Sequence, residues 1–335
     1  MTTHDLTDNP LVRYQQDHLL PRYEAFPHGH YVSLVVIRKT EGEAIFRTEG
    51  SGEGLTKETT IAGMEDETPI VRVMISKRKQ TAVERRTGRE LLRQHDMLPP
   101  NRDGKKDQLC ALNTNRPCER CIDCMLYGFA VGGGGAQKSR VMTDDAFSLA
   151  AASTVTGTRT FNALFDNSTM RNPVTNEPSS SIGEDEYVRP ETHFLDTETL
   201  KDVTLGELAY VIGNVLRSDR YGAISSRIGK VRNTIAAIIF SDCELFSNLE
   251  LTQAVYDRVK AGHQQLPFPL TTGRVQTAVE EGVDYLLPRA MSRQPEVVRG
   301  AELDAVLASL TDVYRSPERV QDLLSEIQSG YPALP

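Results

Sequence analysis

The spacing of apolar and polar residues predicts strands and helices in alternation over the first half of the chain. Two β-rich runs within residues 31–46 flank the turn Thr40-Glu41-Gly42 and predict a hairpin. Residues 70–75 (IVRVMI) alternate with a period of two, which is typical of a strand. Residues 79–93 lack proline and are rich in helix formers, so they predict a helix. Its basic stripe comprises Arg78, Arg85, Arg89 and Arg93.

The second half continues this alternation after a long polar interval. Residues 139–149 (SRVMTDDAFSL) predict a strand, residues 150–186 an excursion from the core, and residues 187–195 an extended segment. Thr204 and Glu207 form a capping box before an apolar helix face. Residues 231–240 predict an apolar strand, and two helices follow near the end, the second with Ser316 as its N-cap. The resulting β-α-β-β-α-β order predicts an α+β protein of the ferredoxin-like class with insertions and a helical C-terminal annex.

Composition places the chain among soluble globular proteins. Of its 335 residues 39% are hydrophobic and 25% charged, and it contains no Trp. The longest apolar run, Ile235 to Phe240, is far shorter than a membrane helix. Because the first residues also lack an apolar signal segment, we expect a cytoplasmic protein without membrane contact.

Charge is unevenly distributed around a net value of −8. Residues 72–93 carry a balance of +6 and residues 217–232 a balance of +4, whereas residues 41–67 and 241–335 each carry −6. Such segregation is typical of a basic nucleic-acid groove on an acidic body, and also of two solvated surface faces.

Four of the five cysteines lie in CALNTNRPCERCIDC, at Cys110, Cys118, Cys121 and Cys124. The spacing C-x7-C-x2-C-x2-C lets four thiolates reach one tetrahedral ion, which favours structural Zn²⁺ over disulfides. An iron–sulfur cluster uses the same ligands and stays open as an alternative. Cys243 follows an apolar run and is interpreted as a small core residue.

Other motifs indicate no catalysis. The glycines of residues 132–135 precede Lys138 without the Gly-Lys-Ser/Thr order of a nucleotide-hydrolysing loop, so we interpret them as a flexible loop near a sugar-phosphate backbone. The histidines form no recognisable triad with Ser or Cys.

Four strings occur in a specific order: CERCIDCMLYGFAVGGGG, QKSRVMTDDAFSL, YVRPETHFLD and RYGAISSRIGKVRN. Together they resemble the backbone subunit of type I-D CRISPR effector (Cascade) complexes, a branch of the RAMP superfamily of guide-RNA-binding proteins. The resemblance covers residues 31–246. It implies an RRM-like palm, a zinc-binding insertion and an extended β-hairpin thumb. The corresponding ranges are 1–100 and 187–246 for the halves of the palm, 101–131 for the zinc insertion, 132–149 for a palm strand, 150–186 for the thumb and 247–335 for the C-terminal helices.

The resemblance also implies partners and a mechanism. Several copies would form a helical filament along one CRISPR RNA, beside other type I-D subunits, and present the guide for pairing with target DNA or RNA. The residues expected at the RNA are Lys77, Arg78, Arg85, Arg89, Lys138, Arg140, Phe161, Phe165, Arg227 and Lys230. The two phenylalanines would wedge against a base, or else form a small hairpin core.

Two other functions remain open from the sequence. Related type III backbone subunits cut target RNA with an acidic loop residue, and Glu49, Glu53 and Asp66 lie in a comparable region. A stand-alone zinc-containing RNA-binding regulator is the third possibility. The first hypothesis, a non-catalytic backbone subunit, is the one we prefer.

Overall fold

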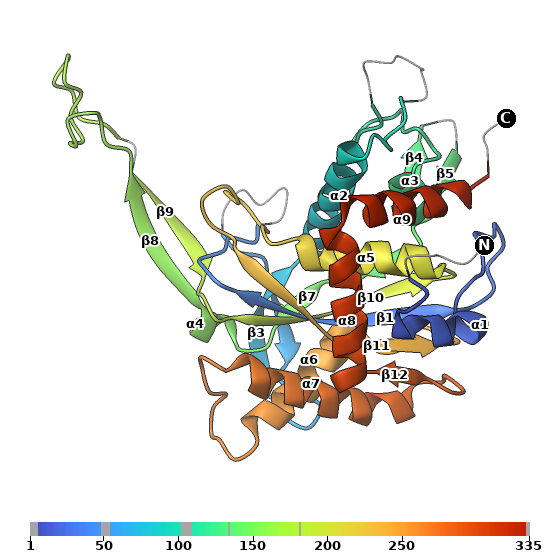
Figure 1. Ribbon diagram of the computed structural model, residues 1–335. Coiled ribbons are helices and arrows are strands. Elements are labelled where there is room, and N and C mark those ends of the chain that lie inside the picture. Colours follow the sequence, from blue (N-terminus) through green and yellow to red (C-terminus); the bar gives the residue numbers. More distant parts are fainter. Residues whose placement is uncertain (1–5, 48–53, 102–108, 133–134, 181, 333–335) are drawn as a thin grey trace.

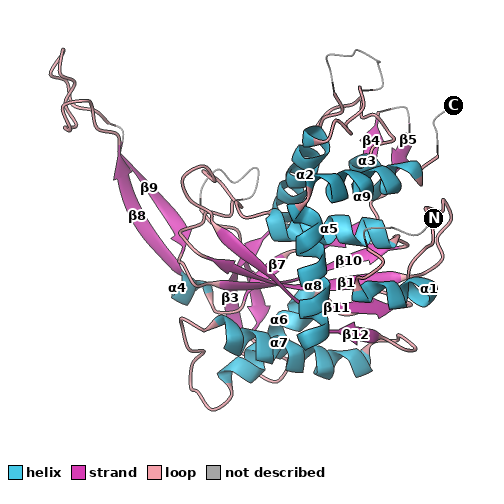
Figure 2. Cartoon of the chain, in the orientation of Figure 1, coloured by secondary structure: helices cyan, strands magenta, loops and turns pink. Residues whose placement is uncertain are grey.

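An eight-stranded antiparallel sheet runs through the middle of the molecule, with helices on both faces (Figures 1 and 2). The computed structural model describes residues 6–47, 54–101, 109–132, 135–180 and 182–332. The strand order is β12-β11-β1-β10-β7-β3-β2, and β6 also pairs with β10. The strands of this sheet are β1 (Tyr31–Thr40), β2 (Lys57–Ile61), β3 (Pro69–Ile75), β6 (Val141–Thr143), β7 (Ala146–Ser148), β10 (His193–Lys201), β11 (Val231–Ser241) and β12 (Glu296–Val298).

Strand β1 lies in the interior of the sheet, between β11 and β10, and both of its faces are apolar. Leu34 and Val36 pack into a core with α2, α5, α8 and α9, whereas Val35 and Ile37 pack on the opposite face with α6 and α7. These helices are α2 (Lys77–Gln94), α5 (Leu205–Arg217), α6 (Asn248–Lys260), α7 (Thr272–Leu286), α8 (Gly300–Arg315) and α9 (Pro317–Ser329), and the short segments are η1 (Pro10–Tyr14), α1 (Gln15–His18) and η2 (Leu287–Arg289).

The predicted mixture of helices and an antiparallel sheet is confirmed. Four adjacent strands of the sheet follow the order β11, β1, β10 and β7. In a β-α-β-β-α-β chain these are the fourth, first, third and second strands, respectively. Helices α2 and α5 make the two crossovers and pack against each other. The strand predicted over residues 139–149 is divided into β6 and β7 by Asp144 and Asp145.

The hairpin predicted over residues 31–46 is wrong. Both edges of β1 are occupied by β10 and β11, so the chain cannot fold back beside it. Ala44 instead bridges Val188, and the Phe46 ring packs edge-on against Phe194 at 5.4 Å. The apolar character of this segment therefore reflects core filling and not strand pairing.

A two-stranded arm projects from the sheet within residues 152–188 (Figure 1). It comprises α4 (Ala152–Val155), β8 (Thr156–Asn162) and β9 (Ile182–Val188), with Thr156 opposite Val188 and Asn162 opposite Ile182. Beyond the strands, the tip is held by local turns such as the Phe165 N–H to Thr169 carbonyl bond (3.0 Å). The arm is anchored at its base, where Val155 and Val188 are buried, whereas its tip has few apolar residues to pack against the body.

The insertion between α2 and β6 contains α3 (Ile122–Tyr127) and a small sheet of β4 (Phe129–Val131) and β5 (Gly135–Gln137). Helix α3 contacts both α2 and α9. Gly128, at φ +78°, ends α3 where a Cβ would lie 2.4 Å from the Gln137 carbonyl oxygen. The insertion is thus attached closely to the helical face of the sheet.

Local capping signals in the second half are observed as predicted. The Thr204 side chain accepts from the Glu207 N–H at 3.2 Å, and Glu207 accepts from the Thr204 N–H at 2.9 Å. Ser316 caps α9, which begins at Pro317. Helices α6 and α7 lie in the expected C-terminal helical segment of residues 247–335, although no separate periodicity predicted them, and they cover the second face of the sheet. Within the described ranges, no helix combines the length and apolarity needed to cross a membrane.

Candidate metal centre and nucleic-acid interface

The four clustered cysteines converge in the buried interior of the insertion. Their Sγ atoms all lie within 4.8 Å of one another. Cys124 Sγ lies 3.7 Å from Cys110 Sγ and 3.8 Å from Cys118 Sγ. Thiolates around one tetrahedral Zn²⁺ would be roughly 3.8 Å apart, given Zn–S bonds of about 2.3 Å. The geometry therefore fits one ion, whereas the ligands of an iron–sulfur cluster bind different iron atoms and lie farther apart.

The electrostatics of the cluster also favour a cation. The Cys118 N–H points to Cys110 Sγ and the Cys121 N–H to Cys118 Sγ, each at 3.3 Å. Hydrogen bonds from the other three thiols lower the pKa of Cys110, while the bonds with Cys110 and Cys118 raise the pKa of Cys124. Four thiols at this separation cannot ionise independently, because the negative charges of neighbouring thiolates repel each other. A bound divalent ion would stabilise the thiolate form of all four.

Arg85 and Arg89, predicted to bind guide phosphates, are both engaged by this insertion, although the partly exposed Arg85 also lines the cleft along the outer face of α2. Arg89 is 1% exposed, and its Nη1 lies 2.7 Å from Asp123 Oδ2. It also donates to the Cys110 carbonyl oxygen. Arg85 forms a two-point contact with the same carboxylate, at 2.9 and 2.8 Å. The correction has a geometric cause: the two residues lie one turn apart on α2, on the face that packs against α3.

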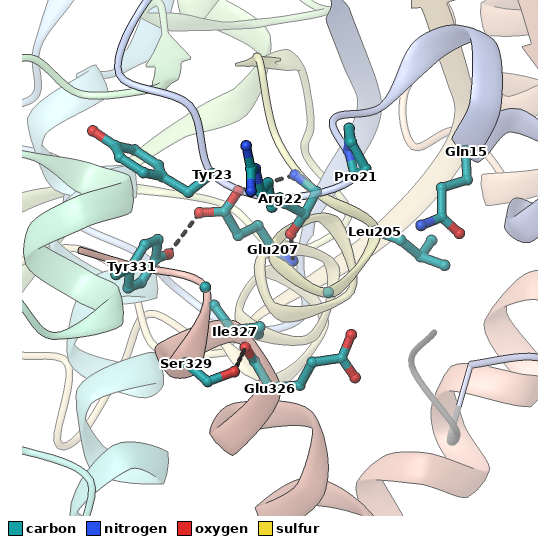
Figure 3. Close-up of a pocket in the computed structure, with 13 residues that line it drawn as sticks. Gln15, Pro21, Arg22, Tyr23, Leu205, Glu207, Glu326, Ile327, Ser329 and Tyr331 are labelled. Carbon is teal, nitrogen blue, oxygen red and sulfur yellow. Dashed lines mark hydrogen bonds between the residues drawn. The ribbon is translucent and has the colours of Figure 1, made fainter. Parts of the chain in front are cut away.

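Arg140 is likewise occupied within the fold. It is paired with the buried Glu207 at the start of α5 and donates to the Asp202 carbonyl oxygen at 2.9 Å. Figure 3 shows Glu207 and Tyr331 directed toward each other, and the tyrosine hydroxyl donates to Glu207 at 2.6 Å. The surrounding cavity of about 190 Å³ lies where α9 packs on α5. Arg140 therefore anchors the C-terminal helices, and its assignment to guide phosphates is withdrawn.

A fully buried ionic cluster attaches α2 to the sheet. Arg38 on β1 donates to Asp196 and Glu198 on β10, at 2.6 and 2.8 Å, and pairs with Glu84 on α2 at 2.8 Å. Burial, and then the charge of Glu84, raise the pKa of Glu198 well above its ordinary value. One cation facing three carboxyl groups indicates that Glu198 keeps its proton.

The outer face of α2 borders a basic cleft of about 570 Å³. Arg78 and Arg86 are exposed there, and Lys79 is half-buried. Leu112 and Asn113 of the insertion form another part of the wall, and Gly222 completes it. Because Leu112 and Asn113 lie between Cys110 and Cys118, the cysteine cluster shapes one side of this cleft.

The segment around Gly222 is a rigid loop between α5 and β11. The Ala223 N–H donates to the Ile45 carbonyl oxygen (2.8 Å), and the Tyr221 N–H donates to that of Gly229 (3.0 Å). Gly222 and Gly229 both have positive φ, and a Cβ on either would lie within 2.4 Å of a carbonyl oxygen. Tyr221 is buried, and its hydroxyl accepts from Arg38 at 3.1 Å. The loop is thereby tied to the buried ionic cluster.

The same loop borders a further cleft, of about 530 Å³, along the outer part of the two strands of the arm. Ile224 and the exposed Arg227 line it from the loop, and Ile182 lines it from β9. Ile224 has φ +54°, which is a costly conformation for a β-branched residue. We call the two clefts together the basic band; it runs from α2 across the loop of residues 221–229 to the arm.

The remaining predicted residues are dispersed. Lys77 is exposed at the start of α2, near Arg78. Lys138 lies at the opposite end of β1, in a different cleft. Lys230 is paired with Asp219. Phe165 lies half-buried in the arm tip, and the side chain of Phe161 lies outside the part of the chain that the structure describes.

Of the three acidic residues considered for cleavage, Asp66 is the one that lies among the described residues. Glu49 and Glu53 lie outside the described residues, as do Gly133 and Gly134 of the glycine loop. Asp66 is paired with Lys260 on α6, and this contact lowers the pKa of Asp66.

Sequence reasoning missed several residues of the basic band. Lys79 and Arg86 lie in the basic stretch of residues 72–93 but are not among the residues expected at the RNA, and neither is Arg159 of the arm, which is paired with Glu43. The helix phase could have placed Lys79 and Arg86 on the outer face of α2. No sequence pattern predicts that Gly222 lies near α2 or that Ile224 lies near the arm, because both positions depend on the path of the loop.

The fold and site define a mixed α and β protein with a buried cluster of four cysteines that fits a metal ion, and with a basic surface band. A sequence profile described as Csc2 Crispr matches residues 18–324, and the chain belongs to this CRISPR family. No curated protein matches the chain in sequence.

Solved structures share the fold at low sequence identity. The crystal structure of Thermofilum pendens Csc2 is similar with a TM-score of 0.60 and 16% identity, covering 97% of this chain and 96% of that one. Chains from two CRISPR RNA-guided surveillance complexes, one in a pre-nicking state, each have a TM-score of 0.50. The pre-nicking chain is 10% identical, with 89% of this chain and 100% of that chain covered; the other is 11% identical, with 88% and 99% covered.

Proposed function

We propose that this protein is the guide-RNA-binding backbone subunit of a type I-D CRISPR effector complex. The observation that carries the proposal is the basic band, because it brings exposed cations of α2 and of the loop of residues 221–229 onto one surface that reaches the arm. Within the arm, Arg159 is paired with Glu43, and Asp185 lines the same cleft. Family membership and the resemblance of the fold to chains of RNA-guided surveillance complexes support it.

In this role the protein binds the guide through its phosphates. Arg86 and Arg227 are exposed along the band, and contacts of this kind position RNA without reading its sequence. The ferredoxin-like, RRM-related palm carries the band, and the projecting arm serves as the thumb. The net charge of −8 limits nonspecific attraction, since the cations are concentrated on one surface.

The four cysteines would hold a structural Zn²⁺ in this proposal. Four thiolates complete its coordination sphere and leave no position for water, so the ion would supply stability and no chemistry. Its effect on RNA binding is indirect: by ordering the segment that carries Leu112 and Asn113, it forms one wall of the α2 cleft.

The protein itself cuts neither guide nor target in this proposal. Copies of it bind side by side along one guide, with other subunits of the complex, and leave the bases available for pairing with target DNA or RNA. Each copy contacts the next through two different surfaces, so the length of the RNA sets the number of copies.

Light scattering on the purified protein tests this proposal. Adding guide RNAs of increasing length should produce assemblies whose mass rises in steps of one subunit. A single fixed dimer at every RNA length would contradict the proposal and favour a stand-alone RNA-binding regulator. Cleavage of a paired target at regular intervals would instead favour the nuclease.

A further inference from the structure

A separate cleft of about 410 Å³ lies at the end of the sheet where β1 begins. Tyr31, the first residue of β1, pairs with Lys201 and Ser241, whereas Thr40, the last, pairs with Val231 beside the basic band. A strand of this length places the two ends roughly 30 Å apart. This cleft is therefore distinct from the basic band.

An exposed aromatic ring stands at the edge of this cleft. Phe26 is 81% exposed. The loop that carries it is anchored at both ends: the Leu20 N–H donates to the Val203 carbonyl oxygen (3.0 Å), and the His30 N–H donates to Asp202 Oδ1 (3.0 Å). The ring is thus held in solvent by a closed loop. A single exposed apolar residue is common on protein surfaces, so the case for a binding site depends on the groups that share the cleft with this ring.

A second ring and two lysines lie within the same cleft. Lys201 Nζ lies 5.1 Å from the centre of the Tyr31 ring, within the range of a cation–π contact. Lys138 is exposed on the segment that follows β5. Aromatic faces beside ammonium groups are the combination that binds unpaired nucleotides, with the base on the ring and the phosphate on the cation.

The carboxylates of the cleft are largely engaged. Glu24 accepts from Arg22 at 3.1 Å, and Asp202 accepts from the His30 N–H. Glu244 is exposed at the rim, where a carboxylate can accept from the exocyclic amino group of a base. The volume of the cleft suits a small ligand and not a folded surface.

We propose that this cleft is a second nucleic-acid site, which binds one unpaired nucleotide of a single strand. The base of this nucleotide stacks on Phe26 and Tyr31, and its phosphate lies near Lys138. The site goes beyond guide binding by the basic band, and its occupant is a nucleotide of either RNA or DNA. The site gives each subunit a base-stacking contact far from the phosphate contacts of the basic band.

Photo-cross-linking tests the site with oligonucleotides that contain 5-iodouracil, in two separate experiments, one with RNA and one with DNA. Mass spectrometry should locate cross-links at Phe26 or Tyr31 as well as in the basic band. The nucleic acid with the higher cross-link yield identifies whether the bound strand is RNA or DNA. Phe26→Ala should lower the cross-link yield at Tyr31 roughly tenfold, since stacking on one aromatic ring contributes an effect of that order. Phe26→Trp should restore it. Met291→Ala is the matched control, because Met291 is even more exposed and lies in an unrelated loop.

The outcomes separate this site from the function proposed above. Cross-links confined to the basic band would overturn the second site and leave guide binding intact. Cross-links at neither surface would overturn both. If Phe26→Ala abolished association between copies while the cross-links stayed unchanged, the occupant would be a neighbouring protein and the nucleotide site would be wrong.

Discussion

Arg89 and Asp123 form a buried ion pair, with Nη1 of the arginine 2.7 Å from Oδ2 of the aspartate. The pair connects α2, which borders the basic cleft, to α3, which contributes Cys124 to the four-cysteine cluster. Arg89 also donates to the Cys110 carbonyl oxygen, so its positive charge lies beside this cluster. Neighbours of metal ligands that are placed in this way orient the ligands and balance their charge.

Replacing Arg89 by Met should therefore destabilise the insertion and weaken metal binding. Removing one partner of an isolated buried ion pair costs about 3–5 kcal/mol. The cost here should be lower, because Arg85 keeps its two-point contact with the Asp123 carboxylate. Urea unfolding and metal analysis would measure the change. Arg93→Met is the control, since Arg93 is exposed on the same helix. Equal stability of the two variants would show that the pair contributes little.

The Lys79→Ala/Arg86→Ala double variant should weaken RNA binding for all sequences alike. Each phosphate contact contributes about 0.7 to the slope of log affinity against log salt on single strands, so the slope should fall by about 1.4. Fluorescence anisotropy over a salt series measures this. Arg93→Ala, outside the cleft, should keep the wild-type slope. An unchanged slope in the double variant would indicate that the outer face of α2 is only solvated.

Cys118→Ser should abolish the metal site and lower the melting temperature. Wild-type protein should contain about one zinc per chain, and a strong chelator should destabilise it in the same way as the substitution. Cys243→Ser is the matched control, because Cys243 lies outside the cluster. Metal-free wild-type protein with the same thermal stability as Cys118→Ser would agree with this prediction; wild-type protein that never contains metal would contradict it.

Glu198 should make the stability of the protein decrease with rising pH. Burial raises its folded-state pKa, so the folded protein keeps a proton that the unfolded chain releases above about pH 4.3. The unfolding free energy contributed by this group is therefore greatest below that pH and is lost as the pH rises toward the folded-state pKa, by at most about 1.4 kcal/mol per pH unit.

Glu198→Gln tests this dependence, because the amide can donate in place of the protonated carboxyl group. Urea unfolding at pH 5 and pH 8 should show the variant gaining stability relative to wild type at the higher pH. Glu244→Gln, at an exposed position, should leave the dependence unchanged. A variant that loses stability equally at both pH values would show that Glu198 is ionised in the folded protein.

The sequence alone determined those features that depend on neighbouring residues. Thr204 and Glu207 cap α5 as expected, since a capping box involves only one turn of backbone. The cysteine spacing predicted a metal site because three of the four ligands lie within seven residues, and the structure brings their sulfurs together. The alternation of strands and helices likewise follows from local periodicity.

Only the tertiary structure decided which charged side chains face solvent. Arg85, Arg86, Arg89 and Arg93 have the same chemistry and share one helix, yet Arg89 is buried against Asp123 while Arg86 and Arg93 are exposed. The phase of α2 against α3 and α5 makes this distinction, and those partners lie distant in sequence. The approach of residues 221–229 to both α2 and the arm depends in the same way on long-range packing. Local patterns thus specify the elements, whereas the binding surface arises from how distant elements pack, since burial and ion pairing are determined by neighbours in space.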